Sequence, residues 1–412
     1  MSAPIDEMTT VENQPTDGQG DDARPLDLIP ESGPLSRLLA ETVQRGGSDL
    51  LLVVDAPPTV FVAGQWMALK EKSMTPEDIA VCIHPILSDA CRDKLAKVRD
   101  LDMGLTLPEG RFRMNVHYQQ GSLAAAIRMI PEKIPPFDRL GLPPQVLRFA
   151  DFSSGLVLVT GGTGQGKSTT LAALIQHMNQ TRSGHIITIE DPIEFAMTHG
   201  TCIIEQREVG FDSPTFASAL RHVLRQRPDV ILIGEMRDPE TMATALTAAE
   251  TGQLVLATLH TSNAAQTIAR IIDVFPPTQQ PQVRTQLAAS LRAILGQVLV
   301  MDKCNETLVP ATELMFATPA IRRAIRDNET HLIYSMIETG RRQGMHTLEQ
   351  SLEALVRAGR VTAEQAMGVA SDPVRMQKTV GHLVRESAVT SGDSSMMESD
   401  PIDVIGSGNP VE

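Results

Sequence analysis

The sequence predicts an α/β protein with two folded domains, an α+β domain followed by a domain built on a parallel sheet. Strand-like runs follow one another between residues 34 and 130, whereas strands and helices alternate from residue 155 onward. A proline-rich stretch, PEKIPPFDRLGLPP, separates the two patterns. A chain of 412 residues is also long enough for two domains that each bury a core.

Two acidic segments flank the predicted domains. Residues 1–33 hold eight acidic side chains and one basic one, and residues 390–412 hold five acidic side chains and no basic one. Both segments lack apolar periodicity, so we expect disordered acidic tails at 1–33 and 386–412. Subtracting −7 and −5 for the two ends from the net charge of −14 leaves about −2 for the remainder. This near-neutral body argues against a nucleic-acid partner, including DNA moved by a translocating ring.

The first domain, residues 34–130, begins with a helix, because apolar residues from Leu35 to Val43 recur at helical spacing. The strand-like runs DLLLVVD, TVFVAG and QWMAL follow. Thr75 is the expected N-cap of a second helix, with proline at the first helical position and Asp78 at the third. LDMGLTL, RFRMNVHY and LAAAIRMI continue the strands, with Pro108-Glu109-Gly110 as a hairpin turn. Consecutive strands of this kind predict an antiparallel sheet.

The second half of the chain divides into three parts. Residues 131–154 are expected to be a linker with one short helix. Residues 155–276 contain the runs LVLVT, HIITIE, DVILIGE and LVLATLH, which are nearly continuous in apolar residues, as strands buried on both faces are. Residues 277–385 show no strand pattern and are expected to be helical.

The cysteine content and the absence of targeting or membrane-spanning patterns predict the cellular compartment of the protein. The four cysteines include no CxxC pair, which predicts reduced thiols rather than a zinc ribbon or a disulfide framework. MSAPIDEMTTVENQ lacks the basic and apolar regions of a signal peptide, and no apolar run is long enough to span a bilayer. We therefore expect a cytoplasmic protein that contacts membranes only through partners.

The stretch LVLVTGGTGQGKSTTLAAL, residues 156–174, carries the GxxxxGK[ST] pattern between a strand and a helix. Its glycines allow backbone N–H groups to surround phosphate oxygens, and the following helix directs its positive end at the same anion. The flanking elements favour a nucleotide site over a simple glycine-rich turn. Lys167 is expected to contact the β- and γ-phosphates of ATP, and Ser168 to ligate Mg²⁺. The predicted nucleotide-binding residues are Gly161, Gly162, Thr163, Gly164, Gln165, Gly166, Lys167, Ser168 and Thr169.

Polar residues follow three further strands. Glu235 ends the apolar run of DVILIGEMRD at the position of a Walker B carboxylate, with Gly234 where many such enzymes carry Asp. Glu194 belongs to an acidic group in ITIEDPIEF together with Glu190 and Asp191, and His260 follows the strand in ATLHTSNAA. Each residue alone has a structural alternative, a solvated loop carboxylate or a structural histidine. Together they favour one site, because the carboxyl ends of strands in an open α/β sheet line the ligand crevice.

These runs together resemble the secretion-type hexameric ATPases, and among them most closely the type IV pilus retraction ATPases (PilT-type). The likeness extends from about Gly33 to about Ala370 and rests on GKSTTLAAL, ITIEDPIEF, GEMRD and TLHTSNAA. Assembly and secretion relatives usually carry extra N-terminal domains and a zinc-binding cysteine cluster, which this sequence lacks. The retraction branch is therefore the expected one.

The resemblance implies a ring of six identical chains and ATP bound between a PAS-like N-terminal domain and a RecA-like domain. It implies that Glu235 orients or deprotonates the attacking water, that Glu194 assists, and that His260 senses the γ-phosphate. Arg113 in RFRMN and Arg128 in IRMIP match the arginines that neutralise charge on the phosphates, a role that preorganised cations suit. The alternative for both arginines is a solvated strand face.

The implied function is an ATP-driven motor that removes pilin subunits from a pilus base, as in twitching motility. Its expected partners are a pilus platform protein of the inner membrane, at the cytoplasmic face, and a sister motor ATPase. Two alternatives stay open: a pilus assembly or type II secretion ATPase, and an accessory ring with weak hydrolysis of its own. Gln253, where the family usually has histidine, favours the accessory ring, as do Arg323 and Ala324, which depart from the AIRNL motif associated with retraction.

Overall fold

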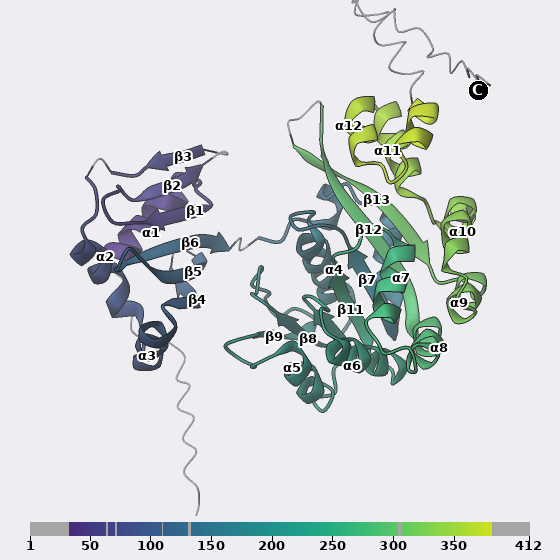
Figure 1. Cartoon of the computed structure of the whole chain (residues 1–412), viewed down its shortest axis with the longest axis horizontal. Coiled ribbons are helices and arrows are strands. Elements are labelled where there is room, and N and C mark those ends of the chain that lie inside the picture. Colours follow the sequence, from purple (N-terminus) through teal and green to yellow (C-terminus); the bar gives the residue numbers. More distant parts are fainter. Residues whose placement is uncertain are drawn as a thin grey trace, which may run out of the picture. The chain divides into compact units, whose positions relative to one another are not determined.

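The computed structural model describes residues 33–380 except 63–64, 71, 109, 131–132 and 304–306. The predicted acidic tails, apart from Gly33, lie outside the described residues, as do Cys304 and Glu109 of the predicted turn. The chain divides into two compact units, Met1–Ile130 and Pro131–Glu412, shown in Figure 1.

The first unit contains an antiparallel sheet of six strands in the order β3-β2-β1-β6-β5-β4, as predicted (Figure 1). Leu39, Leu50, Ile79 and Met114 are fully buried in its core. Thr75 and Asp78 form the predicted capping box at the start of α2. The strands are β1 Asp49–Leu52, β2 Thr59–Val62, β3 Gln65–Ala68, β4 Asp100–Leu107, β5 Gly110–Gln119 and β6 Ser122–Ile130; the helices are α1 Pro34–Gln44, α2 Pro76–Ile83, η1 His84–Ile86 and α3 Asp89–Val98.

The second unit contains a sheet of seven strands in the order β13-β12-β7-β11-β10-β8-β9. All neighbours pair in parallel except β12 and β13, which are antiparallel. Every residue of β7, β10 and β11 is buried, which confirms the prediction from their apolar runs. The strands are β7 Gly155–Thr160, β8 Gly184–Glu190, β9 Cys202–Glu208, β10 Val230–Ile233, β11 Leu254–Leu259, β12 Leu291–Met301 and β13 Leu308–Phe316.

Helices complete the second unit. α4 Lys167–Thr181, α5 Phe216–Val223 and α6 Pro239–Glu250 pack against the sheet. They are followed by α7 Ala264–Asp273 and α8 Gln280–Ser290, and after β13 by α9 Pro319–Arg326, η4 Thr330–Leu332, α10 Ile333–Thr339, η5 Gly340–Gln343, α11 Leu348–Arg357 and α12 Ala363–Val369. Within the described ranges, no helix combines the length and hydropathy that crossing a bilayer requires.

The prediction that residues 277–385 contain helices alone was wrong, because β12 and β13 lie in this region. The residues of β12 read LRAILGQVLVM, and a short, nearly continuous apolar run of this kind does not by itself distinguish a strand from a buried helix. The distinction comes from tertiary pairing. β12 pairs with β7 on one side and with β13 on the other.

The segment expected to be a linker, 131–154, is partly integrated into the second unit. Its elements are η2 Phe137–Arg139 and η3 Pro144–Asp151. Leu142, Val146 and Phe149 are buried in the hydrophobic core of this unit. From about residue 142 the segment is therefore part of the second domain.

Candidate active site

The glycine-rich loop follows β7 and ends where α4 begins at Lys167. Gly161, Gly164 and Gly166 have φ angles of 148°, 76° and 76°, which favour glycine. A Cβ on Gly161 would lie 2.3 Å from the backbone oxygen of Gln297. The loop therefore needs glycine both for its turns and for its close approach to β12.

The side chain of Gln297 on β12 forms hydrogen bonds with the glycine-rich loop and with α4. Its Oε1 accepts a hydrogen bond from Thr170 Oγ1 (2.8 Å), and its Nε2 donates to the carbonyl of Gln165 (2.7 Å). The Gln165 side chain in turn accepts from the backbone N–H of Leu299 at 2.6 Å. Gln297 is buried, so these bonds satisfy an amide that would otherwise be costly to bury. Gln297 was not predicted, because its strand was not predicted and no motif marks it.

Lys167 lies inside the loop. Its Nζ donates hydrogen bonds to the carbonyls of Gly161 (2.9 Å) and Gly162 (2.8 Å), and the side chain is buried. Burial lowers the pKa of Lys167, and the negative charges of Glu235 and Glu194 oppose that shift. The two predicted catalytic carboxylates are thus close enough to act on this ammonium group.

Glu235 and His260 meet at the carboxyl ends of β10 and β11. Oε1 of Glu235 lies 3.2 Å from Nε2 of His260 and 2.7 Å from Nε of Arg237. Burial alone would raise the pKa of Glu235, but the Arg237 hydrogen bond and the charges of His260 and Arg237 outweigh it, so this pKa lies below its ordinary value. The carboxylate is therefore ionised at neutral pH, as a base requires. Arg237 was not predicted as a site residue, and its only sequence signal is its place in GEMRD.

Gly234, which stands where many such enzymes carry Asp, packs closely against β8. A Cβ at this position would lie 3.2 Å from the carbonyl oxygen of Ile189 and 3.3 Å from Cα of Glu190. These are backbone atoms of a buried strand, so a side chain would require the two strands to separate. The close approach of β8 and β10 accounts for glycine here.

The acidic residues after β8 fall into two environments. Glu190 is buried and accepts hydrogen bonds from Thr188 Oγ1 (2.6 Å) and Gln206 Nε2 (3.1 Å), and burial raises its pKa. Glu194 is exposed and acts electrostatically on Lys167. Glu190 thus has the character of a structural residue, whereas Glu194 is free to face a ligand.

Arg113 and Arg128 belong to the first unit, where they are directly opposed on β5 and β6. Opposed residues of an antiparallel pair project from the same face of the sheet. Arg128 Nε lies 2.7 Å from Asp49 Oδ1, and Arg113 lies 3.8 Å from Asp102. The two predicted arginines therefore form one exposed basic pair, each beside a carboxylate that orients it.

The loop has the groups that a magnesium–triphosphate requires. Gly162, Thr163 and Gly164 are exposed, so the backbone of the turn is open to a ligand. α4, a helix of 15 residues, starts at the same point and brings Ser168 and Thr169 into its first turn. Backbone N–H groups, one ammonium group and a hydroxyl are the donor set that phosphates and Mg²⁺ prefer.

Comparisons with known proteins agree with this geometry. A family model described as type II/IV secretion system protein matches residues 126–390. The type IV pilus retraction ATPase PilT of Pseudomonas aeruginosa is 42% identical over 340 residues, 82% of this chain and 98% of the relative. The type IV pilus ATPase PilU of the same organism is 39% identical, covering 80% of this chain and 87% of PilU.

A solved structure extends the likeness to the fold. A crystal structure of the pilus retraction motor PilT with bound ADP matches with a TM-score of 0.79 and 45% identity, over 84% of this chain and 99% of that one. This match confirms the predicted RecA-like class of the second unit. The chain belongs to the type II/IV secretion system protein family, as a PilT-like member of its ATPases.

Proposed function

We propose that this protein is a homo-hexameric, Mg²⁺-dependent ATPase that couples ATP hydrolysis to type IV pilus retraction. The observation that carries the proposal is the contact of Glu235 with His260 and Arg237, beside a glycine loop whose Lys167 experiences the charge of Glu235. The 42% identity to a pilus retraction ATPase supports the biological role.

In this proposal each site residue of the second unit has a separate role in ATP hydrolysis. Lys167 and the loop N–H groups hold the β- and γ-phosphates, and Ser168 ligates Mg²⁺, which neutralises phosphate charge when bound. Glu235 orients or deprotonates the attacking water, and Arg237 lowers the pKa of that carboxylate. His260 bonds to Glu235 and senses the γ-phosphate, and Glu194 assists from the exposed side.

The first unit, PAS-like in this proposal, supplies the remaining cations. In this proposal the charge of Arg113 and Arg128 stabilises the transferring phosphoryl group. In the cell the ring docks on a platform protein at the cytoplasmic face of the inner membrane, and a sister motor is a further partner.

The accessory-ring alternative is weakened by the position of Gln253. Its side chain accepts a hydrogen bond from Thr251 (2.9 Å), and its carbonyl accepts one from the N–H of Gly155 (3.0 Å). It stands before β11 and His260 after it, so the two are roughly 20 Å apart along the strand. The substitution at 253 therefore leaves the Glu235 cluster intact. A pilus assembly or secretion motor would use the same chemistry, so ATP turnover alone does not distinguish it from a retraction motor.

The test is steady-state ATP turnover of the purified full chain, alone and mixed with a purified sister motor, with ring mass read by light scattering. We expect a particle of six chains that turns ATP over by itself. Turnover that appears only in the mixture would reject an autonomous motor in favour of the accessory ring. Deletion of the gene distinguishes the biological roles: loss of retraction with pili retained is expected, whereas loss of pili would indicate an assembly motor.

A further inference from the structure

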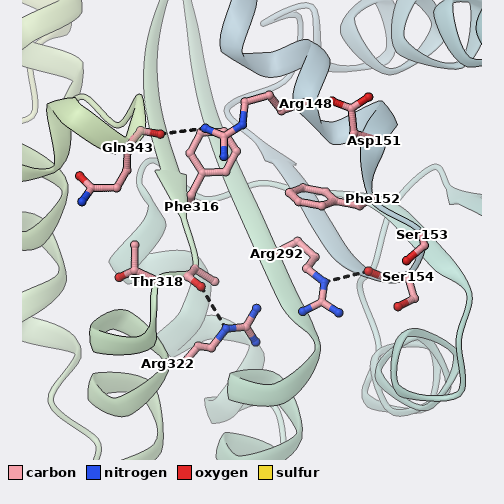
Figure 2. A pocket seen from close by; sticks show the side chains of 11 residues that line it. Arg148, Asp151, Phe152, Ser153, Ser154, Arg292, Phe316, Thr318, Arg322 and Gln343 are labelled. Carbon is pink, nitrogen blue, oxygen red and sulfur yellow. Dashed lines mark hydrogen bonds between the residues drawn. The ribbon is translucent and has the colours of Figure 1, made fainter.

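A hollow of about 510 Å³ lies in the second unit and is shown in Figure 2. Its lining includes Ser153 and Ser154 just before β7, Arg292 at the start of β12, and Phe316 at the end of β13. β7 and β12 are parallel, and the nucleotide loop follows the carboxyl end of β7. The hollow is therefore at the opposite edge of the sheet from the ATPase site.

Three arginines line this hollow, and backbone carbonyls hold each of them in place. Arg292 Nε donates to Ser154 O (2.8 Å), Arg148 donates to Gln343 O (2.8 Å), and Arg322 donates to Ala288 O (2.6 Å) and Ala289 O (2.7 Å). The guanidinium carbon of Arg148 also lies 4.1 Å from the centre of the Phe316 ring. These contacts fix the guanidinium groups, so a ligand need not order them on binding.

The charge of this cluster is not balanced. Within the part of the chain that the structure describes, Arg148, Arg292 and Arg322 form no ion pair with a carboxylate, in contrast to Arg360, which lies against Asp302. Asp151 is the one acidic residue in the described lining. Burial lowers the pKa of Arg322, and the nearby charge of Arg292 lowers it further.

The surroundings of the hollow are basic as well. Arg341 and Arg342 are exposed and immediately precede Gln343 of the lining. Arg326 is exposed on α9, the helix that carries Arg322. These arginines add positive charge next in sequence to lining residues or on the same helix, in a protein whose net charge is −14.

We propose that this hollow binds the carboxylates of an acidic peptide, and that its occupant is this chain's own segment 390–412. The segment holds Asp393, Glu398, Asp400, Asp403 and Glu412 and no basic residue. Guanidinium groups match carboxylates in paired hydrogen bonds. The volume of about 510 Å³ far exceeds the roughly 10–15 Å³ that one water molecule needs on the same measure, so the hollow has room for more than a small inorganic ion.

The covalent connection favours this segment over a separate acidic partner. It is joined to the second unit through residue 380, and residues 381–412 can span a distance on the order of 100 Å when extended. A tethered ligand of this kind has an effective concentration in the millimolar range, so modest intrinsic affinity is sufficient. This proposal is independent of the proposed motor function.

The experiment measures binding of a fluorescent peptide, residues 390–412, to the full chain by anisotropy. The receptor is a full-length variant whose own segment is neutralised by Asp393→Asn, Glu398→Gln, Asp400→Asn, Asp403→Asn and Glu412→Gln. We expect salt-sensitive binding to this receptor, and weaker binding to the unmodified chain, whose own segment competes. Equal binding to both receptors, or none to the neutralised one, would overturn the proposal.

Two further substitutions in the neutralised receptor locate the site. Arg148→Gln removes a guanidinium group that contacts Gln343 O and the Phe316 ring, and we expect it to weaken peptide binding about tenfold. Arg270→Gln on α7, an exposed arginine outside the hollow, is the matched control and should leave affinity unchanged. Equal effects of the two substitutions would place binding elsewhere. Displacement of the peptide by equimolar inorganic phosphate would assign the hollow to a free oxyanion instead.

Discussion

Glu235 and Glu313 lie in the same unit, yet their pKa values are shifted in opposite directions. Arg237 and His260 contact Glu235, and the pKa of Glu235 lies below its ordinary value. Glu313 is buried on β13, accepts a hydrogen bond from the N–H of Ala264 (2.7 Å), and burial raises its pKa to about 7. Burial thus favours the protonated form of Glu313, whereas the partners of Glu235 favour its ionised form.

The first prediction concerns ATP binding at the glycine loop, the site where Glu235 is proposed to act. Lys167→Ala removes the ammonium group from the glycine loop, and we expect it to abolish ATP binding measured by calorimetry. Lys97→Ala, at an exposed position on α3, is the control and should bind ATP normally. Unchanged affinity in the Lys167 variant would show that the nucleotide binds elsewhere.

The second prediction tests the neutral state of Glu313. Between pH 4.5 and about pH 7 the unfolded chain releases this proton while the folded chain keeps it, so the stability of the folded chain falls as pH rises. The shift corresponds to roughly 3 kcal/mol in the free energy of unfolding. Glu313→Gln should remove this loss, so that the difference between variant and parent changes from pH 5 to pH 8 in urea titrations. Glu364→Gln, exposed on α12, should show no such change; a pH-independent difference for Glu313→Gln would mean that Glu313 is ionised in the folded protein.

The third prediction concerns Arg237, whose guanidinium group contacts Glu235. Arg237→Gln eliminates the hydrogen bond and charge that lower the pKa of Glu235, so the acidic limb of the turnover–pH profile should move to higher pH. Turnover at pH 6 should therefore fall more than turnover at pH 8. Arg237→Lys, which keeps the charge, should restore part of the profile. A uniform loss of activity across pH would instead indicate direct contact of Arg237 with substrate.

The smallest effect is expected at Gln253. Gln253→His introduces the residue that is usual in the family. Position 253 precedes β11, so it lies at the opposite edge of the sheet from Glu235. ATP turnover should change by less than about twofold, because no residue of the cluster loses a contact. A large gain in turnover would show that position 253 acts through a contact between subunits, and would revive the accessory-ring alternative.

Local patterns predicted most of the fold and part of the site. The glycine loop and the runs ending at Glu235 and His260 carry their signal within a few residues, and the structure brings these residues together. β12 could not be predicted, because its short apolar run is compatible with either a helix or a strand. Its pairing with β7 determines that it is a strand. The roles of Gln297 and Arg237 come from tertiary contacts that residue spacing does not reveal. Glu190 and Glu194 differ in burial, which the sequence motif does not show either.

The most direct test of the central claim is Glu235→Gln, which keeps the shape of the side chain and removes the base. We expect the variant to bind ATP with unchanged affinity while turnover falls roughly 10²- to 10⁴-fold. Glu205→Gln, an exposed glutamate on β9, should retain full turnover. Near-normal turnover by Glu235→Gln would contradict the account and transfer the role of base to Glu194 or another group.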